Sequence, residues 1–387
     1  MVQSFKPSAE PGSNDRIAQT IEVEVDDEDD QYELLEGERE IVDDSNNNDD
    51  DDNDNDDDED GTYSITSTRS QFTIQPVYEN GRRYCNDTYF MPNDDAEQTR
   101  LNIVHQAFLM LLDGELTKAP APNGPSRILD IGTGPGDWAV EMGEMYPNAE
   151  IIATDISVFD AGPGIIGLPN VHFQLDDAEE EWTYHEPFDL IHFRCLTGAF
   201  RNWDGVYRQA FKHLRAGGYI EVAESEPDFE SFIAPELKSD SYYNILASAM
   251  RSAADATDFP RGRDHLRSSS LTAVGFVDVR TYDITVPVGT WPDDPKQRTL
   301  GKMILIVFLE GLEARSLRQL TATGNWTAEG VRDICEKARL EIAVSKGASV
   351  TVRFMTGRKP MSHAPHRLRR QLQIQKLVDE MKKSELQ

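Results

Sequence analysis

The sequence has few cysteines and no long apolar run. Its three cysteines, Cys85, Cys195 and Cys335, show neither the pairing of a disulfide framework nor the spacing of a zinc site. No apolar stretch approaches the roughly 20 residues that a membrane helix needs, and the N-terminus lacks the basic-then-apolar pattern of a secretion signal. We therefore expect an intracellular chain, cytoplasmic or nuclear or both, with no membrane segment and no bound metal.

Basic side chains are also scarce, and the excess of acid is concentrated at one end. The chain holds 38 Lys and Arg against 70 Asp and Glu, for a net charge of −32. The first 60 residues alone hold 25 acidic and 3 basic side chains. Such a segment cannot bury enough apolar surface to offset its ordering entropy, so residues 1–62 are predicted to be disordered. We interpret this tail as solubilising, with a protein partner as the alternative. The mildly acidic remainder argues against direct nucleic-acid binding.

Beyond the acidic tail, short apolar strands alternate with helical patterns. This alternation favours a parallel sheet with helices on both faces. Strands are predicted over residues 128–131, 150–154, 171–175, 188–193, 219–223, 276–288 and 348–357. Helices are predicted over 94–112, 138–146, 206–214, 235–254, 263–273, 295–317 and 327–344, with Asp94 or Asp95, Asp137 and Thr327 as N-caps.

The stretch over residues 127–138 reads as a strand, a glycine turn and a helix start. Gly132, Gly134 and Gly136 let a ligand approach the backbone, and the following helix offers free N–H groups. Their G-x-G-x-G spacing is not the dinucleotide fingerprint G-x-G-x-x-G. Asp130 beside the turn would repel a diphosphate but attract an ammonium group. S-adenosylmethionine carries an ammonium, a sulfonium and an adenosine, and it fits this chemistry.

Further polar residues follow the next two predicted strands, at the edge where open α/β sheets bind ligands. Asp155, with Ile156 beside it, ends the second strand and can accept hydrogen bonds from both ribose hydroxyls. Asp176, Asp177 and Ala178 follow the third strand. There a carboxylate can accept from the adenine amino group while the backbone N–H of Ala178 meets a ring nitrogen. These positions predict the adenosine half of the site.

The methionine half is predicted from two segments. Arg194 lies at the end of the fourth strand. Arg82, Arg83 and Tyr84 are candidates to hold the carboxylate, with a simple surface turn at Gly81 as the alternative. The predicted cofactor site comprises Asp130, Gly132, Thr133, Gly134, Gly136, Asp155, Ile156, Asp176, Asp177, Ala178, Arg194 and Tyr84.

The catalytic residues stay open. Methyl transfer to an activated nucleophile needs mainly alignment and a dry site, whereas a phenol or alcohol acceptor needs a base. His192, Glu224 and Tyr89 are candidates for that base, and a structural role for His192 as a buried histidine is the alternative.

Residues 127–224 resemble the core of the class I S-adenosylmethionine-dependent methyltransferases. Over roughly 70–360 the pattern is similar to the LaeA-like fungal methyltransferases, a family that includes a global regulator of secondary metabolism. The resemblance implies a doubly wound, mostly parallel, seven-stranded sheet with a reversed last strand. It also implies S-adenosylmethionine as cofactor and helices over the site. The motifs that carry it occupy residues 78–84, 89–94, 97–105, 130–136, 176–179, 188–194 and 217–224.

The resulting division has four parts. Residues 1–62 form the acidic tail, and 63–120 an N-terminal helical lid segment. Residues 121–360 form the methyltransferase domain, with an insert at about 225–275, and 361–387 a C-terminal amphipathic helix.

Three functions compete. The leading one is a methyltransferase that acts on a small metabolite or a protein and is linked to fungal secondary metabolism. The second is a regulatory protein that binds S-adenosylmethionine with little turnover. The third, disfavoured by the glycine spacing, is a nicotinamide-dependent oxidoreductase.

Overall fold

A computed structural model of the chain describes residues 76–87, 89–120, 124–157, 159, 168–224, 232–255 and 262–361. The acidic tail and nearly all of the C-terminal helix predicted from the sequence lie outside these described residues.

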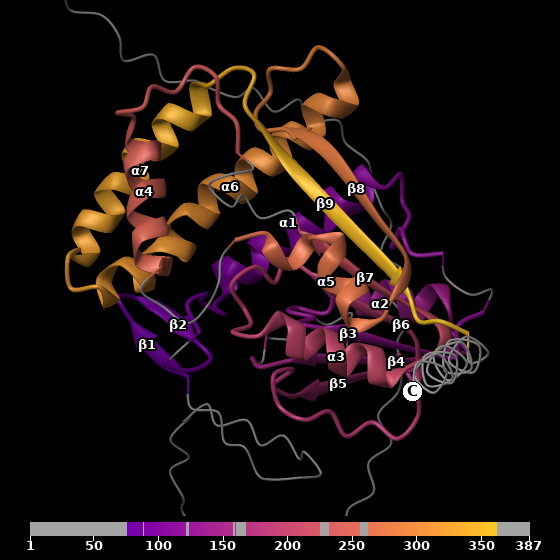
Figure 1. The fold of residues 1–387 in the computed structure, drawn as a ribbon. Helices are drawn as coiled ribbons and strands as arrows, with labels where there is room; N and C mark the ends of the chain where they lie inside the picture. The colour runs from indigo at the N-terminus through magenta and orange to yellow at the C-terminus, as the bar shows by residue number, and fades with distance from the viewer. Residues whose placement is uncertain are drawn as a thin grey trace, which may run out of the picture. The chain divides into compact units, whose positions relative to one another are not determined.

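Seven strands form one sheet in the order β5-β4-β3-β6-β7-β9-β8 (Figure 1). The five strands from β5 to β7 pair in parallel, whereas β9 runs antiparallel to both of its neighbours. The predicted doubly wound, mostly parallel sheet with a reversed last strand is thus confirmed. The strands are β3 (Arg127–Ile131), β4 (Glu150–Asp155), β5 (Val171–Leu175), β6 (Phe188–Arg194), β7 (Leu214–Glu224), β8 (Val277–Pro287) and β9 (Ser349–Arg358).

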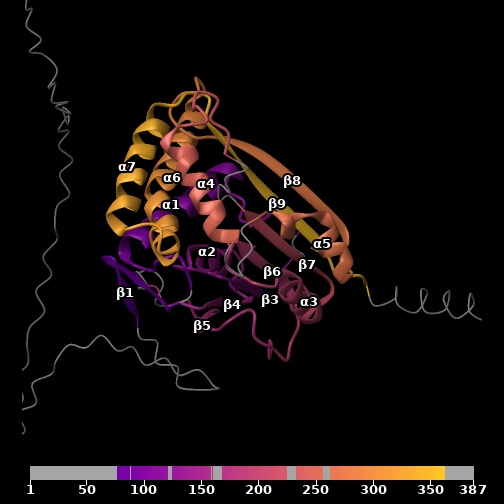
Figure 2. The ribbon, with the colours of Figure 1, turned by 60° about the vertical axis from the view of Figure 1, so that its left-hand side comes forward.

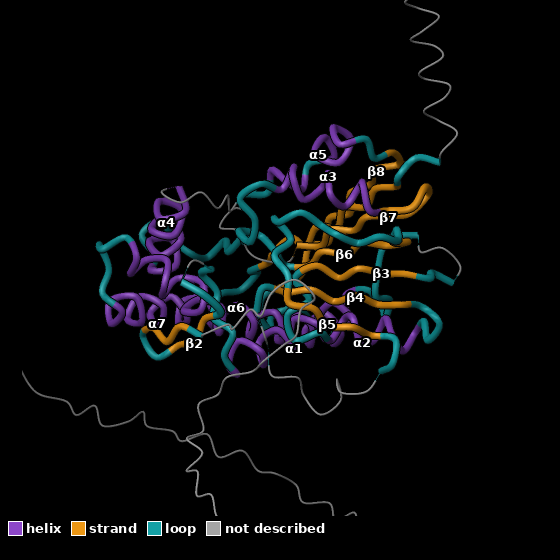
Figure 3. The backbone as a smooth tube through the Cα atoms, turned by 90° about the horizontal axis from the view of Figure 1, so that it is seen from below, coloured by secondary structure: helices purple, strands orange, loops and turns teal. Residues whose placement is uncertain are grey.

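Helices cover both faces of this sheet, and the central strands β3, β4 and β6 are buried on both sides. Figure 3 shows α3 (Trp203–His213) and α5 (Ser268–Val274) on one face, with α1 (Asp95–Leu111) and α2 (Asp137–Met145) on the other. Successive side chains of a strand point to opposite faces. Accordingly, Leu129 of β3 packs in the cluster that contains Tyr207 of α3, and Ile128 packs in the cluster that contains Trp138 of α2.

A second group of helices joins α4 (Tyr242–Asp255), α6 (Pro295–Ala322) and α7 (Ala328–Val344), which pack on one another (Figure 2). α1 packs against α6, and these elements share one apolar core with β8 and β9. In the sequence, α6 and α7 lie between β8 and β9, where helices were predicted over residues 295–317 and 327–344. None of the described helices has the length and apolar character needed to cross a bilayer.

Helix boundaries follow the local capping chemistry. Asp94 and Thr327 each accept a backbone N–H from three residues ahead, which confirms both as N-caps. The N-cap of α2 is instead Gly136, and Asp137 is the first helical residue, so that prediction was wrong. The left-handed backbone at Gly136, with φ of +93°, already turns the chain into the helix. α4 begins later than predicted because Ser241 caps it through the N–H of Asn244.

The N-terminal hairpin, β1 (Val77–Glu79) and β2 (Arg82–Tyr84), is bound to α6 by one buried arginine. Arg318 is 5% exposed, and its Nε donates to Glu79 at 2.8 Å. Its Nη1 donates to the carbonyls of Asn86 and Tyr89 at 2.7 and 2.8 Å, and its guanidinium lies 3.7 Å from the Tyr84 ring centroid. One side chain therefore ties the N-terminal segment to a helix more than 200 positions later.

We predict that Arg318→Met lowers the free energy of unfolding by about 2 kcal/mol, because three partly buried acceptors lose their donor together. Urea denaturation of the full chain measures this.

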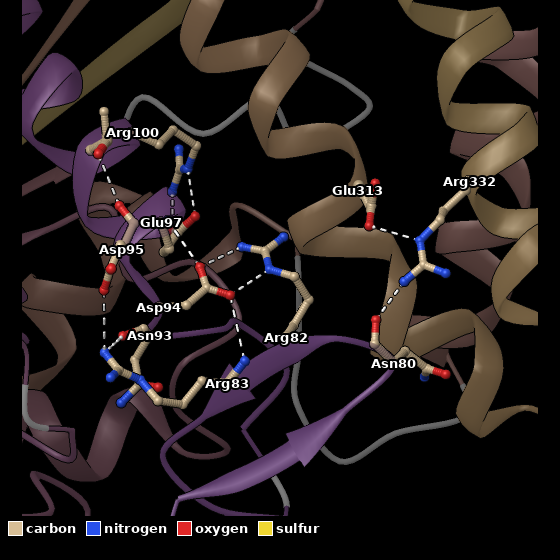
Figure 4. A network of polar contacts seen from close by, with 11 residues as sticks. Asn80, Arg82, Arg83, Asn93, Asp94, Asp95, Glu97, Arg100, Glu313 and Arg332 are labelled. Atoms are coloured by element: carbon tan, nitrogen blue, oxygen red, sulfur yellow. Dashed lines mark hydrogen bonds and ion pairs between the residues drawn. The ribbon is translucent and has the colours of Figure 1, made fainter. Parts of the chain in front are cut away.

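The matched control is Arg332→Met. Arg332 also reaches the hairpin, through the carbonyl of Asn80, but its side chain is 45% exposed (Figure 4). Exposed ion pairs contribute little, so this variant should change the free energy by less than about 1 kcal/mol. Equal losses in both variants would show that Arg318 has no special role.

Candidate functional site

The turn between β3 and α2 leaves open space beside its backbone. Gly132 and Gly134 have φ of +66° and +58°, a conformation that L side chains rarely adopt. A Cβ at Gly132 would lie 2.4 Å from Leu196 Cδ2, so the chain itself fills that position. A Cβ at Gly134 would meet only Leu101 Cδ1, at 3.6 Å. The space at Gly134 is therefore available to a ligand.

A cleft lies beside this turn, at the carboxyl ends of β3 to β6. Its walls come from the turn, the ends of the strands, the segment after β6 and N-terminal residues between 85 and 104. Gly136 and Tyr84 are not among its lining residues. The ten other predicted residues all line it: Asp130, Gly132, Thr133, Gly134, Asp155, Ile156, Asp176, Asp177, Ala178 and Arg194.

Asp155 is held at the tip of β4 by the turn of the neighbouring strand. Its Oδ2 accepts the N–H of Gly134 at 2.8 Å, and its Oδ1 accepts the N–H and the hydroxyl of Ser157 at 2.9 and 2.8 Å. Burial raises the pKa of Asp155, and the negative charge of Asp130 acts in the same direction, while these hydrogen bonds lower it. The carboxylate is thus fixed in place within the cleft wall.

The segment after β5 is fixed by its own hydrogen bonds. The N–H of Asp176 donates to the carbonyl of Asp155 at 3.0 Å, and Asp177 Oδ1 accepts the N–H of Glu179 at 2.9 Å. Glu179 Oε1 in turn accepts the N–H groups of Arg201 and Asn202, both at 2.9 Å, at the start of α3. Glu179 therefore joins two walls of the cleft.

Asp130 contacts the sheet interior as well as the cleft. Its Oδ1 lies 2.7 Å from Nδ1 of His192, which is its register partner on β6. The imidazole is 1% exposed and stacks on the Trp138 ring, with centroids 3.7 Å apart. His192 does not line the cleft. Its contacts match the alternative of a buried structural histidine, and its ring holds the Asp130 carboxylate from the interior of the sheet.

Glu221 of β7 lies deeper still, with no exposed surface. Its Oε2 accepts the N–H groups of Lys118 and Ala119, both at 2.7 Å, and the hydroxyl of Thr117 at 2.9 Å. These bonds attach the segment after α1 to the centre of the sheet. Burial raises the pKa of Glu221, although nearby His192 and the three donors favour the charged form.

The N-terminal arginines are engaged away from the predicted carboxylate site. Arg82 donates through Nε and Nη2 to Asp94, the N-cap of α1, at 2.5 and 2.8 Å (Figure 4). Arg83 Nη2 donates to the carbonyl of Asn93 at 2.7 Å. The Tyr84 ring is fully buried, and burial raises its pKa to about 12. The two arginines fix the start of α1, and none of the three residues lines the cleft.

A buried ion pair on α1 was missed by sequence reasoning. Glu97 and Arg100 both line the cleft, and each is 3% exposed. Arg100 Nε and Nη2 donate to the two carboxylate oxygens of Glu97 at 2.9 and 2.6 Å (Figure 4). The signal in the sequence was the i, i+3 spacing of opposite charges, which is also common on solvated helix faces.

The other base candidates lie in different settings. Tyr89 lines the cleft, and its own backbone carbonyl accepts a hydrogen bond from Arg318. Glu224, 2% exposed at the end of β7, accepts the N–H of Leu196 at 3.0 Å and lies 3.6 Å from Nε2 of His265. Within the described part of the chain, no three His, Cys, Asp or Glu side chains are grouped as metal ligands.

Comparisons with known proteins agree with this architecture. Residues 103–273 match a family model described as "Methyltransferase domain". The secondary metabolism regulator LAE1 of Cochliobolus heterostrophus is 35% identical over 73% of this chain and 94% of its own length. The methyltransferase pytC of Aspergillus terreus is 33% identical over 66% of this chain and 78% of its own. The secondary metabolism regulator laeA of Aspergillus flavus is 30% identical over 73% of this chain and 77% of its own length.

The likeness to solved structures is looser. Phosphoethanolamine N-methyltransferase 2 of Haemonchus contortus, solved with S-adenosyl-L-methionine, aligns over 68% of this chain and 53% of its own length. The sequence identity is 16% and the TM-score is 0.37.

The strand order, the reversed β9 and the matched domain define a class I methyltransferase fold. Identity of 35% along almost the whole length of one relative places the chain more narrowly. It belongs to the LaeA-like family of fungal methyltransferases.

The buried carboxyl of Glu221 makes a pH-dependent prediction. Because its folded pKa is raised, the native state binds this proton more tightly than the unfolded chain, and stability is lost as pH rises above the ordinary value of 4.5. Glu221→Gln keeps an acceptor oxygen without the charge. We expect the melting temperature of the variant to gain on that of the wild type between pH 4 and pH 7.

Thermal melts across this pH range test the prediction, with Glu144→Gln on the exposed side of α2 as control. The control should follow the wild type at every pH. If the melting temperature of Glu221→Gln instead fell relative to that of the wild type as pH rises, the argument would be contradicted.

Proposed function

We propose that the cleft binds S-adenosylmethionine and that the chain transfers its methyl group to an acceptor. One observation carries this: acids at three neighbouring strand ends, Asp130, Asp155 and Asp176, line a single cleft beside an open turn. The donor presents an ammonium, two ribose hydroxyls and an adenine amino group. Each of these donates hydrogen bonds, and a carboxylate accepts from all of them.

The order of the strands supports an assignment of the donor's groups to these acids. β5 is the edge strand, followed by β4 and β3. Asp176, Asp177 and Ala178 after β5 are assigned to the adenine, and Asp155 of β4 to the ribose. Asp130 of β3 is assigned to the ammonium, with His192 holding its carboxylate in position. Gly134 lets the backbone approach closely, while Thr133, Ile156 and Arg194 complete the wall.

A diphosphate cofactor fits this cleft poorly. Dinucleotide sites offer several N–H groups to the pyrophosphate at the start of a helix. Here Pro135 removes one N–H, the N–H of Gly134 is already bonded to Asp155, and the carboxylates of Asp130 and Asp137 line the same space. These charges repel phosphate and attract a cation, which supports the methyl donor over a nicotinamide dinucleotide.

The bound donor would supply an electrophilic methyl group on its sulfonium. The chain's task is then alignment and exclusion of water, and the N-terminal segment from Asn86 to Val104 provides one wall for this. We propose a small metabolite or a protein as acceptor, in an intracellular setting. The names of the fungal relatives support a link to regulation of secondary metabolism. A donor-binding regulator with little turnover is the second candidate.

Gly134→Ala tests the donor site directly. A methyl group there enters open space, so the fold should survive with a backbone strain of about 1–2 kcal/mol. Calorimetric titration should show S-adenosylmethionine affinity at least tenfold lower than in the wild type. Gly324→Ala is the matched control, because Gly324 has a φ of +72° and nothing within 4 Å of its Cβ position.

The proposal fails if the wild type binds NAD but not S-adenosylmethionine, or if both glycine variants bind the donor equally well. Turnover separates the two candidate functions. Release of S-adenosylhomocysteine with pools of small metabolites or basic peptides supports the enzyme, and donor binding without release supports the regulator.

A further inference from the structure

One face of α1 forms a wall of the cleft. Glu97, Arg100, Leu101 and Val104 all line it, at the i, i+3, i+4 and i+7 spacing of a single helix face. Leu101 is the side chain nearest the open position at Gly134. The helix therefore passes directly beside the glycine turn.

The same helix continues toward the end of β6. Phe108, two turns beyond Leu101, lies under the Arg194 guanidinium, 5.1 Å from its carbon. α1 thus crosses the ends of β3 and β6. In the sheet, β3 and β6 lie beyond β4 on the side opposite β5. If the adenosine of the donor lies at the ends of β4 and β5, its amino-acid end lies at the ends of β3 and β6, beside α1.

The charged pair in this wall is built to stay in place. Two hydrogen bonds join Arg100 to Glu97, and both residues are 3% exposed. Asp94 and Arg82 fix the turn of helix that carries them (Figure 4). Burying two charges costs solvation that the pair alone does not always recover. A ligand that presents a charge to this wall would add a compensating interaction.

We propose that Arg100 binds the α-carboxylate of the donor's amino-acid end, with Glu97 as the residue that positions its guanidinium. This rests on the proposed function. A guanidinium has five N–H donors and can serve two carboxylates at once. With Asp130 on the ammonium, the amino acid's two opposite charges meet opposite charges on α1 and β3.

The other arginines near the cleft fit this task less well. Arg82 binds Asp94 and does not line the cleft. Arg201 pairs with Glu179 beside the adenine end. Arg194 rests on Phe108 and also borders an inner void next to His192. Arg100 is the arginine that combines near-complete burial, a fixed orientation and a place beside the turn.

The test compares two ligands that differ only in the half under discussion. S-adenosylhomocysteine carries the amino acid, and 5′-methylthioadenosine lacks it. Calorimetric titration of the full chain should show that Arg100→Met lowers affinity for S-adenosylhomocysteine about tenfold or more, the usual range for a charge-assisted hydrogen bond. Affinity for 5′-methylthioadenosine should change less than twofold.

Arg100→Met alone leaves Glu97 buried without its partner, which can unfold the protein. The double variant Glu97→Gln/Arg100→Met removes both charges, and it should discriminate between the ligands in the same way. Arg208→Met, on the exposed side of α3, is the matched control and should leave both affinities unchanged.

Equal losses for the two ligands, or no loss for either, would overturn the assignment of Arg100 while leaving the adenosine site intact. A wild type that binds neither ligand would overturn the proposed function and this inference together.

Discussion

The parallel pairing of β3 with β4 and β6 is the constraint on which the cleft depends. It brings three strand ends to one edge and sets their register, so that Asp130 lies opposite His192 and one strand away from Asp155. Side chains alternate along each strand, and this alternation directs Asp130 to the face where Trp138 and His192 stack. A shift of one residue would exchange that polar contact for Leu129 or Ile131 and would move the acid to the α3 face.

The second requirement is a wall opposite the turn, and segments distant in sequence supply it. α1 reaches across the ends of β3 and β6, and Arg318 of α6 holds the hairpin before it. The helices between β8 and β9 therefore contribute to the cleft without lining it. Their apolar core fixes α6, α6 fixes the hairpin, and the hairpin fixes Asp94 at the start of α1 through Arg82. This series of contacts therefore fixes the position of the Glu97–Arg100 pair on α1.

Much of this could be predicted from the sequence, because strands and turns carry local signals. The five parallel strands, the glycine turn and the acid at the end of β4 are specified by neighbours within a few positions. What could not be predicted depends on contacts between distant residues. Nothing near Arg318 indicates that it meets a hairpin, and Glu97 and Arg100 have the spacing of an ordinary surface pair. The same limit explains why Arg82 was a ligand candidate: its partner Asp94 becomes decisive only when the chain folds back.

The cleft gathers more negative than positive charge, and this has an energetic consequence. Asp130, Asp137, Asp155 and Asp176 line one space, and the charge of Asp130 raises the pKa of Asp155 beyond the effect of burial. Like charges held together in a partly dry site repel, which costs stability in the free protein. A ligand with an ammonium and a sulfonium attracts these carboxylates and also reduces the repulsion between them. Both effects favour binding of a cation. An anionic ligand would be repelled by the cleft except near Arg100, Arg194 and Arg201. The charges of the cleft therefore favour a cationic ligand such as the methyl donor, whatever the acceptor.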